Sequence, residues 1–208
     1  MGLSRREFLS LTASAMTVAL RGDGSPRTDP PVAAVLDLQE HCALRESLAG
    51  YARASAGVVP HRPVLIVPAA LALPAAATSE VAGCLRRGGT VLLESGAGFA
   101  AESGFRAHRD ALRNRLQLRV AAARSKSRGV PYIDYVWPYP TKIRDFSRVV
   151  PLAEHQPGEV IAWADGFPVA SKRRIGTGTL MYLGAPLGPA LWAGDTEARQ
   201  WLSRLFSL

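Results

Sequence analysis

Short apolar runs alternate with amphipathic stretches along most of this chain. Three runs are short and nearly continuous in apolar residues: 32–38, 64–67 and 90–93. Such runs are typical of strands that are buried on both faces. Helical spacing or helix-capping residues mark three further stretches: 40–55, 79–87 and 100–116. Strands that alternate with helices predict right-handed crossovers and a mainly parallel sheet.

The pattern changes in the second half of the chain. Extended segments are expected at 159–164, 168–175 and 179–183. The turns Asp165-Gly166 and Gly176-Thr177-Gly178 between them predict antiparallel hairpins. Asp195 is a cap for a last helix over 196–206. The expected fold is a three-layer α/β/α flavodoxin-like domain, with a mainly parallel sheet and antiparallel hairpins at one edge.

The first twenty residues resemble a twin-arginine export signal. Arg5 and Arg6 precede an apolar run that carries no charge between Phe8 and Leu20. A short amphipathic or buried helix is the alternative. With a signal at 1–20 and a polar linker at 21–31, the folded domain would cover 32–208 and would be exported folded, to the periplasm or envelope. A membrane would be contacted only through an uncleaved N-terminal segment.

Composition limits the classes of function. Hydrophobic residues make up 48% and charged residues 20%, as in an ordinary globular protein. The net charge of +8 comes mostly from arginine, and we interpret it as solvated surface, with no nucleic-acid partner expected. Cys42 and Cys84 allow one pair at most, and no cysteines or histidines have metal-ligand spacing. The sequence therefore indicates neither a metal nor a cofactor.

Three sequence segments together resemble the class I glutamine amidotransferase-like superfamily. These segments are 62–68, 82–93 and 174–184. The resemblance implies a nucleophilic cysteine directly after the third strand, and a late His-x-Glu pair that activates it. Here that turn is Glu94-Ser95-Gly96-Ala97-Gly98, without cysteine, and His155 lies too far from Glu159 to form the pair. The resemblance therefore implies a non-catalytic member.

The turn at 94–98 is the main candidate site, because ligands bind at the carboxyl ends of strands in open α/β sheets. Glu94 and Ser95 would supply polar groups, and Gly96 and Gly98 would let a ligand approach the backbone. A plain strand-to-helix turn is the alternative. Asp37 ends the first strand, at the same rim of the predicted sheet. There it would either contact a ligand or cap the following helix. Cys84 is either a packed core thiol or a nucleophile.

An aromatic segment at 132–148 is the second candidate. Tyr135, Trp137 and Arg144 would offer a rigid, half-polar surface to a partner protein or a sugar ring. The alternative is a loop that folds back over the edge of the sheet.

These observations lead to two hypotheses. The first is an exported, non-catalytic amidotransferase-like domain that binds or scaffolds a protein partner or a small ligand. The alternative is a hydrolase of an amide, ester or glycoside that uses Ser95 or Cys84, assisted by Glu94 or Asp37.

Overall fold

The computed structural model describes residues 32–127, 131–145, 148–154 and 157–208. The expected export signal at 1–20 and linker at 21–31 lie outside these residues, as does His155, and none of the comparisons below supports a twin-arginine signal. No helix in the described part of the chain is both long and apolar enough to cross a membrane.

One eight-stranded mixed sheet runs through the molecule, in the order β1-β2-β3-β8-β7-β6-β4-β5. The strands are β1 (Ala33–Val35), β2 (Val64–Ala70), β3 (Thr90–Ser95), β4 (Tyr132–Tyr135), β5 (Thr141–Arg144), β6 (Glu159–Ala164), β7 (Phe167–Ile175) and β8 (Gly178–Leu183). The helices are α1 (Arg45–Ser55), α2 (Ala75–Arg86), α3 (Glu102–Leu116), α4 (Gly188–Ala193) and α5 (Thr196–Phe206), with short 3-10 helices η1 (Gln39–His41) and η2 (Ala97–Phe99).

The first half of the sheet is parallel. β1 pairs with β2, β2 with β3, and β3 with β8, all in parallel. Helices α1 and α2 form the crossovers between β1, β2 and β3, as the alternation of apolar runs predicts. The carboxyl ends of these strands therefore meet at one rim, to which β3 brings Glu94 and Ser95.

The second half of the sheet corrects the expected fold class. β8–β7, β7–β6, β6–β4 and β4–β5 are all antiparallel, so the sheet is mixed and curled and not a mainly parallel flavodoxin-like sandwich. The two expected hairpins are present at the turns Asp165-Gly166 and Gly176-Thr177, where Asp165, Gly166 and Gly176 have the positive φ that tight hairpins require. The correction comes from β4 and β5, which add two further antiparallel pairs, because the short connection at 136–140 between them cannot form a crossover.

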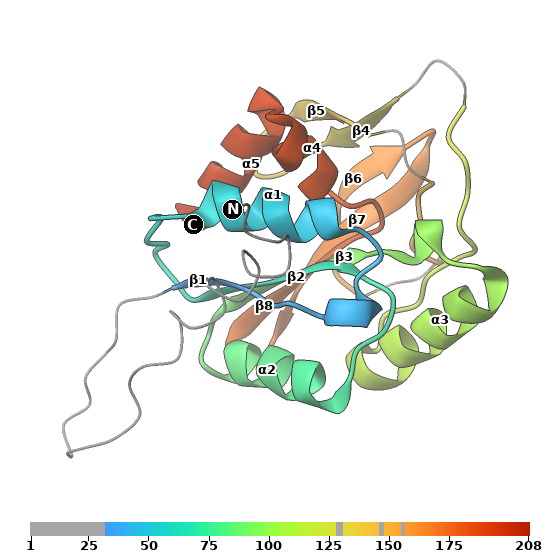
Figure 1. Cartoon of the computed structure of the whole chain (residues 1–208), viewed down its shortest axis with the longest axis horizontal. Helices are drawn as coiled ribbons and strands as arrows, with labels where there is room; N and C mark the ends of the chain where they lie inside the picture. The colour runs from blue at the N-terminus through green and yellow to red at the C-terminus, as the bar shows by residue number, and fades with distance from the viewer. Residues whose placement is uncertain (1–31, 128–130, 146–147, 155–156) are drawn as a thin grey trace, which may run out of the picture.

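Two apolar clusters hold the helices against the sheet. One cluster joins α1, α4 and α5 to one face, with Tyr51, Leu191 and Trp201 fully or almost fully buried. The other joins α2 and α3 to the opposite face, with Leu85 and Leu112 among its members. In Figure 1 the sheet runs between these two groups of helices.

Several elements differ from the sequence-based expectation. β2 continues through Pro68 to Ala70, and α2 begins at Ala75, directly after Pro74. α4 was not expected, since the sequence predicted a helix in this region only over 196–206. Part of the expected aromatic loop is instead the hairpin of β4 and β5 at the far edge of the sheet.

Candidate functional site

Ser95 and His108 form a hydrogen-bonded pair inside the molecule. Ser95 ends β3, and His108 lies on the inner face of α3. The Ser95 Oγ and His108 Nε2 atoms are 2.9 Å apart, and both side chains are buried, at 1% and 0% exposure. A hydroxyl next to an imidazole is the arrangement that activates a serine nucleophile.

A backbone carbonyl sets the orientation of the imidazole. His108 Nδ1 lies 3.2 Å from the Leu71 carbonyl oxygen, which can only accept, so Nδ1 carries the proton and donates it. Nε2 is then the acceptor for the Ser95 hydroxyl. Burial lowers the pKa of His108 from 6.5 to about 4, so the ring is neutral and able to accept a proton at pH 7. The pair therefore has the protonation pattern of a nucleophile and its base.

A pocket lies one layer outside this pair. It has a volume of ≈ 360 Å³ and is lined by Ala97 of η2, by Phe105, Arg106 and Arg109 of α3, and by Arg148 among others. The Ala97 N–H donates to Ser95 Oγ at 3.2 Å, so Ala97 contacts the serine and also lines the pocket.

Glu94 precedes Ser95 but faces the other side of the sheet, as neighbouring residues in a strand do. Its carboxyl group is fully buried, and it accepts from the Tyr51 hydroxyl and from the backbone N–H groups of Ala69, Leu187 and Gly188. Burial raises its pKa from 4.5 to about 7, although these hydrogen bonds oppose the rise. Glu94 therefore links α1, β2 and α4, and it does not assist Ser95.

Cys84, the other candidate nucleophile, and Asp37, the candidate carboxylate at the rim, lie away from the pair of Ser95 and His108. Cys84 is buried on α2, its Sγ lies 3.7 Å from the Thr90 carbonyl oxygen, and burial raises the pKa of its thiol. These are the features of a packed core cysteine and not of a nucleophile. Asp37 accepts from the Gln39 N–H at 2.7 Å, as in an Asx turn, and from Arg45 at 3.3 Å, and it caps neither η1 nor α1.

Gly96 and Gly98 are explained by packing. A Cβ atom on Gly96 would overlap the Ala69 carbonyl oxygen, and one on Gly98 would overlap the Arg148 carbonyl oxygen. The glycines therefore let chain segments approach each other, and the structure does not place them around an open ligand space.

The aromatic candidates divide between core and surface. Tyr135 is buried against Trp201, with ring centroids 5.0 Å apart. Trp137 is half-buried; its carbonyl oxygen accepts from Trp201 Nε1, and Lys172 lies over its ring at 4.3 Å. Arg144 lies over the Tyr132 ring at 5.8 Å. This segment therefore closes the edge of the core and leaves only part of its surface free.

Arg144 also lines a second pocket, of ≈ 350 Å³, at the carboxyl rim of the sheet. Its walls include Phe99, Pro186 and Pro189, and its carboxylates are Glu46, Asp145 and Asp195. Asp145 forms an ion pair with the buried Lys126, and Asp195 caps α5 by accepting from the Ala198 N–H at 2.9 Å. Within the described ranges, no group of three or more histidine, cysteine or acidic residues could hold a metal ion.

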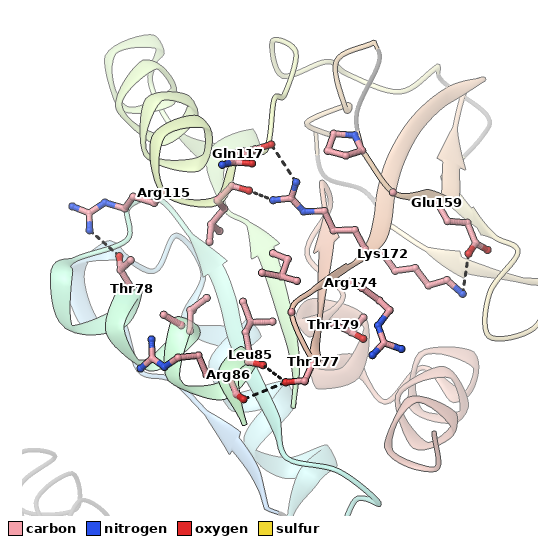
Figure 2. A pocket seen from close by; sticks show the side chains of 18 of the residues that line it. Thr78, Leu85, Arg86, Arg115, Gln117, Glu159, Lys172, Arg174, Thr177 and Thr179 are labelled. Carbon is pink, nitrogen blue, oxygen red and sulfur yellow. Dashed lines mark hydrogen bonds and ion pairs between the residues drawn. The ribbon is translucent and has the colours of Figure 1, made fainter. Parts of the chain in front are cut away.

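A much larger pocket, of ≈ 1270 Å³, opens at the other end of the sheet (Figure 2). It lies between the ends of α2 and α3 and the β7–β8 hairpin, and Thr179 at the start of β8 lines it. Gly176 and Thr177 of the expected hairpin turn line it, although no site was expected there.

No protein-family model matches this chain, and no curated protein sequence matches it. Solved structures do match. The α-L-fucosidase isoenzyme 2 of Paenibacillus thiaminolyticus has a TM-score of 0.52 at 14% identity, and the match covers 84% of this chain and 33% of that chain. The β-galactosidase of Marinomonas ef1 has a TM-score of 0.51 at 16% identity, covering 82% and 29%. That of Rahnella sp. R3 has 0.51 at 13% identity, covering 83% and 32%.

These comparisons correct the expected resemblance. The fold is shared with glycosidases, and the likeness to the class I glutamine amidotransferase-like superfamily was wrong. The sequence segments that suggested this resemblance are buried strands and glycine turns, which many layered folds share. This chain spans about a third of the length of each matched glycosidase.

His108 was not among the candidate residues that the sequence suggested, although a helix was expected over 100–116. Phe105, His108 and Leu112 are three and four residues apart, so they share one helical face, and Leu112 is fully buried. A histidine at such an inner position was the available signal for a base near Ser95.

Proposed function

We propose that this chain is a hydrolase that cleaves an ester or amide bond, with Ser95 as the nucleophile and His108 as the general base. The 2.9 Å contact between Ser95 Oγ and the unprotonated His108 Nε2 supports this proposal. The non-catalytic interpretation rested on the missing cysteine after the third strand and the missing His-x-Glu pair. Ser95 and His108 offer a different nucleophile and a different base.

In the proposed reaction, Ser95 Oγ attacks the carbonyl carbon of the substrate while its proton passes to His108 Nε2. The imidazolium then protonates the leaving alcohol or amine, and an acyl-serine remains. Water then attacks this ester, again with His108 as the base. This step releases the acid product and regenerates free Ser95. The Leu71 carbonyl oxygen, which accepts from Nδ1, holds the ring in place and favours its charged form.

The substrate would enter from the ≈ 360 Å³ pocket beside Ala97. Because Ser95 is only 1% exposed, η2 must move before an acyl group reaches Oγ. The Ala97 N–H, which already donates to Oγ, lies close to where the oxyanion would form.

The test combines covalent labelling with turnover. We expect a fluorophosphonate probe to modify Ser95, located by peptide mass spectrometry, and 4-nitrophenyl acetate to be hydrolysed. Ser95→Ala and His108→Gln should each lower turnover about a thousandfold or more. Ser79→Ala is the matched control, because Ser79 is an exposed serine on α2 whose hydroxyl donates to its own helix. Absence of label from Ser95, or unchanged turnover in Ser95→Ala, contradicts the proposal.

Glycoside hydrolysis is the second candidate. The matched solved structures are named as a fucosidase and β-galactosidases, and the rim pocket holds Glu46, Asp145 and Asp195. Glycosidases usually need two carboxyl groups on either side of the scissile bond. The test uses 4-nitrophenyl α-L-fucoside and β-D-galactoside. Cleavage that Glu46→Gln and Asp195→Asn abolish, and that Ser95→Ala leaves intact, would favour this candidate over the first.

A further inference from the structure

The pocket of ≈ 360 Å³ beside Ala97 is lined by positive charge. Arg106 and Arg109 of α3 line it, together with Arg148 from the segment between β5 and β6. None of the described residues that line it is acidic, so the arginines leave an excess of three positive charges. A cavity whose walls carry one sign of charge concentrates ligands of the opposite sign.

Two of these arginines are available to a ligand. Arg106 and Arg109 are three residues apart on α3, so their Cβ atoms lie about 5–6 Å apart on one side of the helix. Both side chains are exposed, and within the described residues neither takes part in an ion pair. Two guanidinium groups at this spacing can hold one carboxylate between them.

The third arginine is held in place by the fold. Arg148 Nη2 donates to the Ala123 carbonyl oxygen at 2.9 Å, and Ala123 also lines the pocket. The backbone of Arg148 packs against η2, since a Cβ atom on Gly98 would overlap its carbonyl oxygen. An anion in the pocket would therefore have to order only the side chains of Arg106 and Arg109.

The rest of the pocket wall is small and apolar. Phe105 and Ala123 are partly buried and pack against the apolar cluster on this face of the sheet. Ala97, Ala100 and Ala122 add only methyl groups. At about 30 Å³ for each non-hydrogen atom, the share of a molecule in liquid water, ≈ 360 Å³ holds roughly a dozen such atoms. This is room for a short carbon chain that ends in one carboxylate.

Ala97 links this pocket to the proposed nucleophile. Its N–H donates to Ser95 Oγ at 3.2 Å, and the residue also lines the pocket. Helix α3 carries His108, the proposed base, as well as Arg106 and Arg109. One helix therefore positions both the base and two of the cations, on the face of the sheet where Ser95 lies.

We propose that the substrate is an ester or amide whose acyl part ends in a carboxylate. Arg106 and Arg109 bind this carboxylate, and Phe105 and the alanines contact the carbon chain that joins it to the scissile carbonyl group. The inference rests on the proposed function, with Ser95 as the nucleophile. The charge is assigned to the acyl part because this part stays bound to Ser95 until water cleaves it, whereas the leaving group must depart after the first step.

A matched pair of esters tests the charge preference. Mono-4-nitrophenyl adipate carries the carboxylate, and methyl 4-nitrophenyl adipate has the same chain without the charge. We expect kcat/KM to be at least about tenfold higher for the charged ester. Arg106→Gln/Arg109→Gln should lower the ratio of the two kcat/KM values at least about tenfold.

Arg199→Gln/Arg204→Gln is the control for the loss of two positive charges. Both residues are exposed on α5, which packs on the other face of the sheet, so this variant should keep the wild-type ratio. Circular dichroism of each variant checks that the fold is retained.

Binding without turnover separates this inference from the proposed function. Adipate, which has no bond to hydrolyse, is titrated into the Ser95→Ala protein by isothermal titration calorimetry. We expect it to bind at one site per chain, and adding Arg106→Gln/Arg109→Gln should weaken its binding at least about tenfold.

The possible outcomes are distinct. If neither ester is cleaved, the proposed function is wrong and the substrate assignment fails with it, whatever adipate does. If the esters are cleaved, three results overturn the substrate class alone. They are a wild-type ratio near one, a ratio that the double variant at α3 leaves unchanged, and adipate that does not bind. A charge preference confined to the leaving group, measured with 4-acetoxybenzoate and its methyl ester, overturns it as well.

Discussion

Replacing Glu94 by glutamine should change how the stability of the protein depends on pH. The carboxyl group is fully buried and its pKa is raised from 4.5 to about 7. Between these values the folded protein keeps a proton that the unfolded chain releases. The contribution of Glu94 to stability is therefore fully present below pH 4.5 and is lost as the pH rises through 7. A pKa rise of this size corresponds to about 3 kcal/mol.

The Glu94→Gln variant separates this effect from ordinary loss of contacts. Its side-chain amide would keep an oxygen that can accept from Tyr51, Leu187 and Gly188, but its NH₂ group would face the Ala69 N–H, which donates to Glu94 at 3.2 Å. An unpaired buried donor costs about 1–3 kcal/mol, so Glu94→Gln should be less stable than the wild type at pH 4.5. At pH 8 the wild type has lost about 3 kcal/mol that the variant does not lose, so the difference should vanish or reverse.

Urea unfolding followed by tryptophan fluorescence at pH 4.5, 6 and 8 gives the free energy of unfolding of both proteins. Glu80→Gln, on the exposed face of α2, controls for the loss of one charge. Tyr51→Phe should behave in the opposite way, because it removes a hydrogen bond to the ionised carboxylate and so costs more above pH 7. A difference between wild type and Glu94→Gln that stays constant, or grows in favour of the wild type as the pH rises, would refute this reasoning.

Three further substitutions test other contacts. The free energy of unfolding of the wild type should fall by about 3 kcal/mol as the pH falls from 6.5 to 4, because the pKa of the buried His108 is about 4 and the unfolded chain binds the proton first. His108→Gln should remove this pH dependence, and urea unfolding over this range checks it. Gly184→Ala should destabilise the fold by about 3 kcal/mol, because its Cβ would overlap the carbonyl oxygen of Val150, and a lower urea midpoint would show it. Asp195→Ala should cost about 1 kcal/mol through the lost cap of α5, with Asp195→Asn close to the wild type in the same assay.

Local features of the fold were predictable from the sequence, and its long-range pairing was not. The helix after Asp195 and the turn at Asp165-Gly166 depend on residues next to each other, and the structure confirms both. The order of the strands depends on the path from α3 to β4 at the far edge of the sheet. No pattern within 117–131 encodes that path. The sequence therefore predicted the antiparallel hairpins of β6, β7 and β8 but not the pairing of β4 with β5 and β6, so the parallel share of the sheet was overestimated.

The candidate site was partly predictable for the same reason. The carboxyl end of β3 was identified because the run at 90–93 and the following glycines mark a strand end. The roles of its residues depend on which face each one occupies. Ser95 meets His108 only because β3 and α3 pack together, and Glu94 meets Tyr51 only because α1 covers the other face. Strand alternation predicts opposite faces for Glu94 and Ser95, but it does not say which helix lies on either side.

The end of β3 therefore joins both helical layers of the molecule, and its two polar residues set opposite limits on pH. Ser95 has a free base only while His108 is neutral, which requires a pH above about 4. The burial of Glu94 costs least free energy when its carboxyl group is protonated, which requires a pH below about 7. In the proposed hydrolase, the pH range in which the base is free and the burial of Glu94 costs least lies between these two values. Because His108 is already neutral well below pH 7, a rise to pH 8 should add no free base, while it lowers the free energy of unfolding through Glu94.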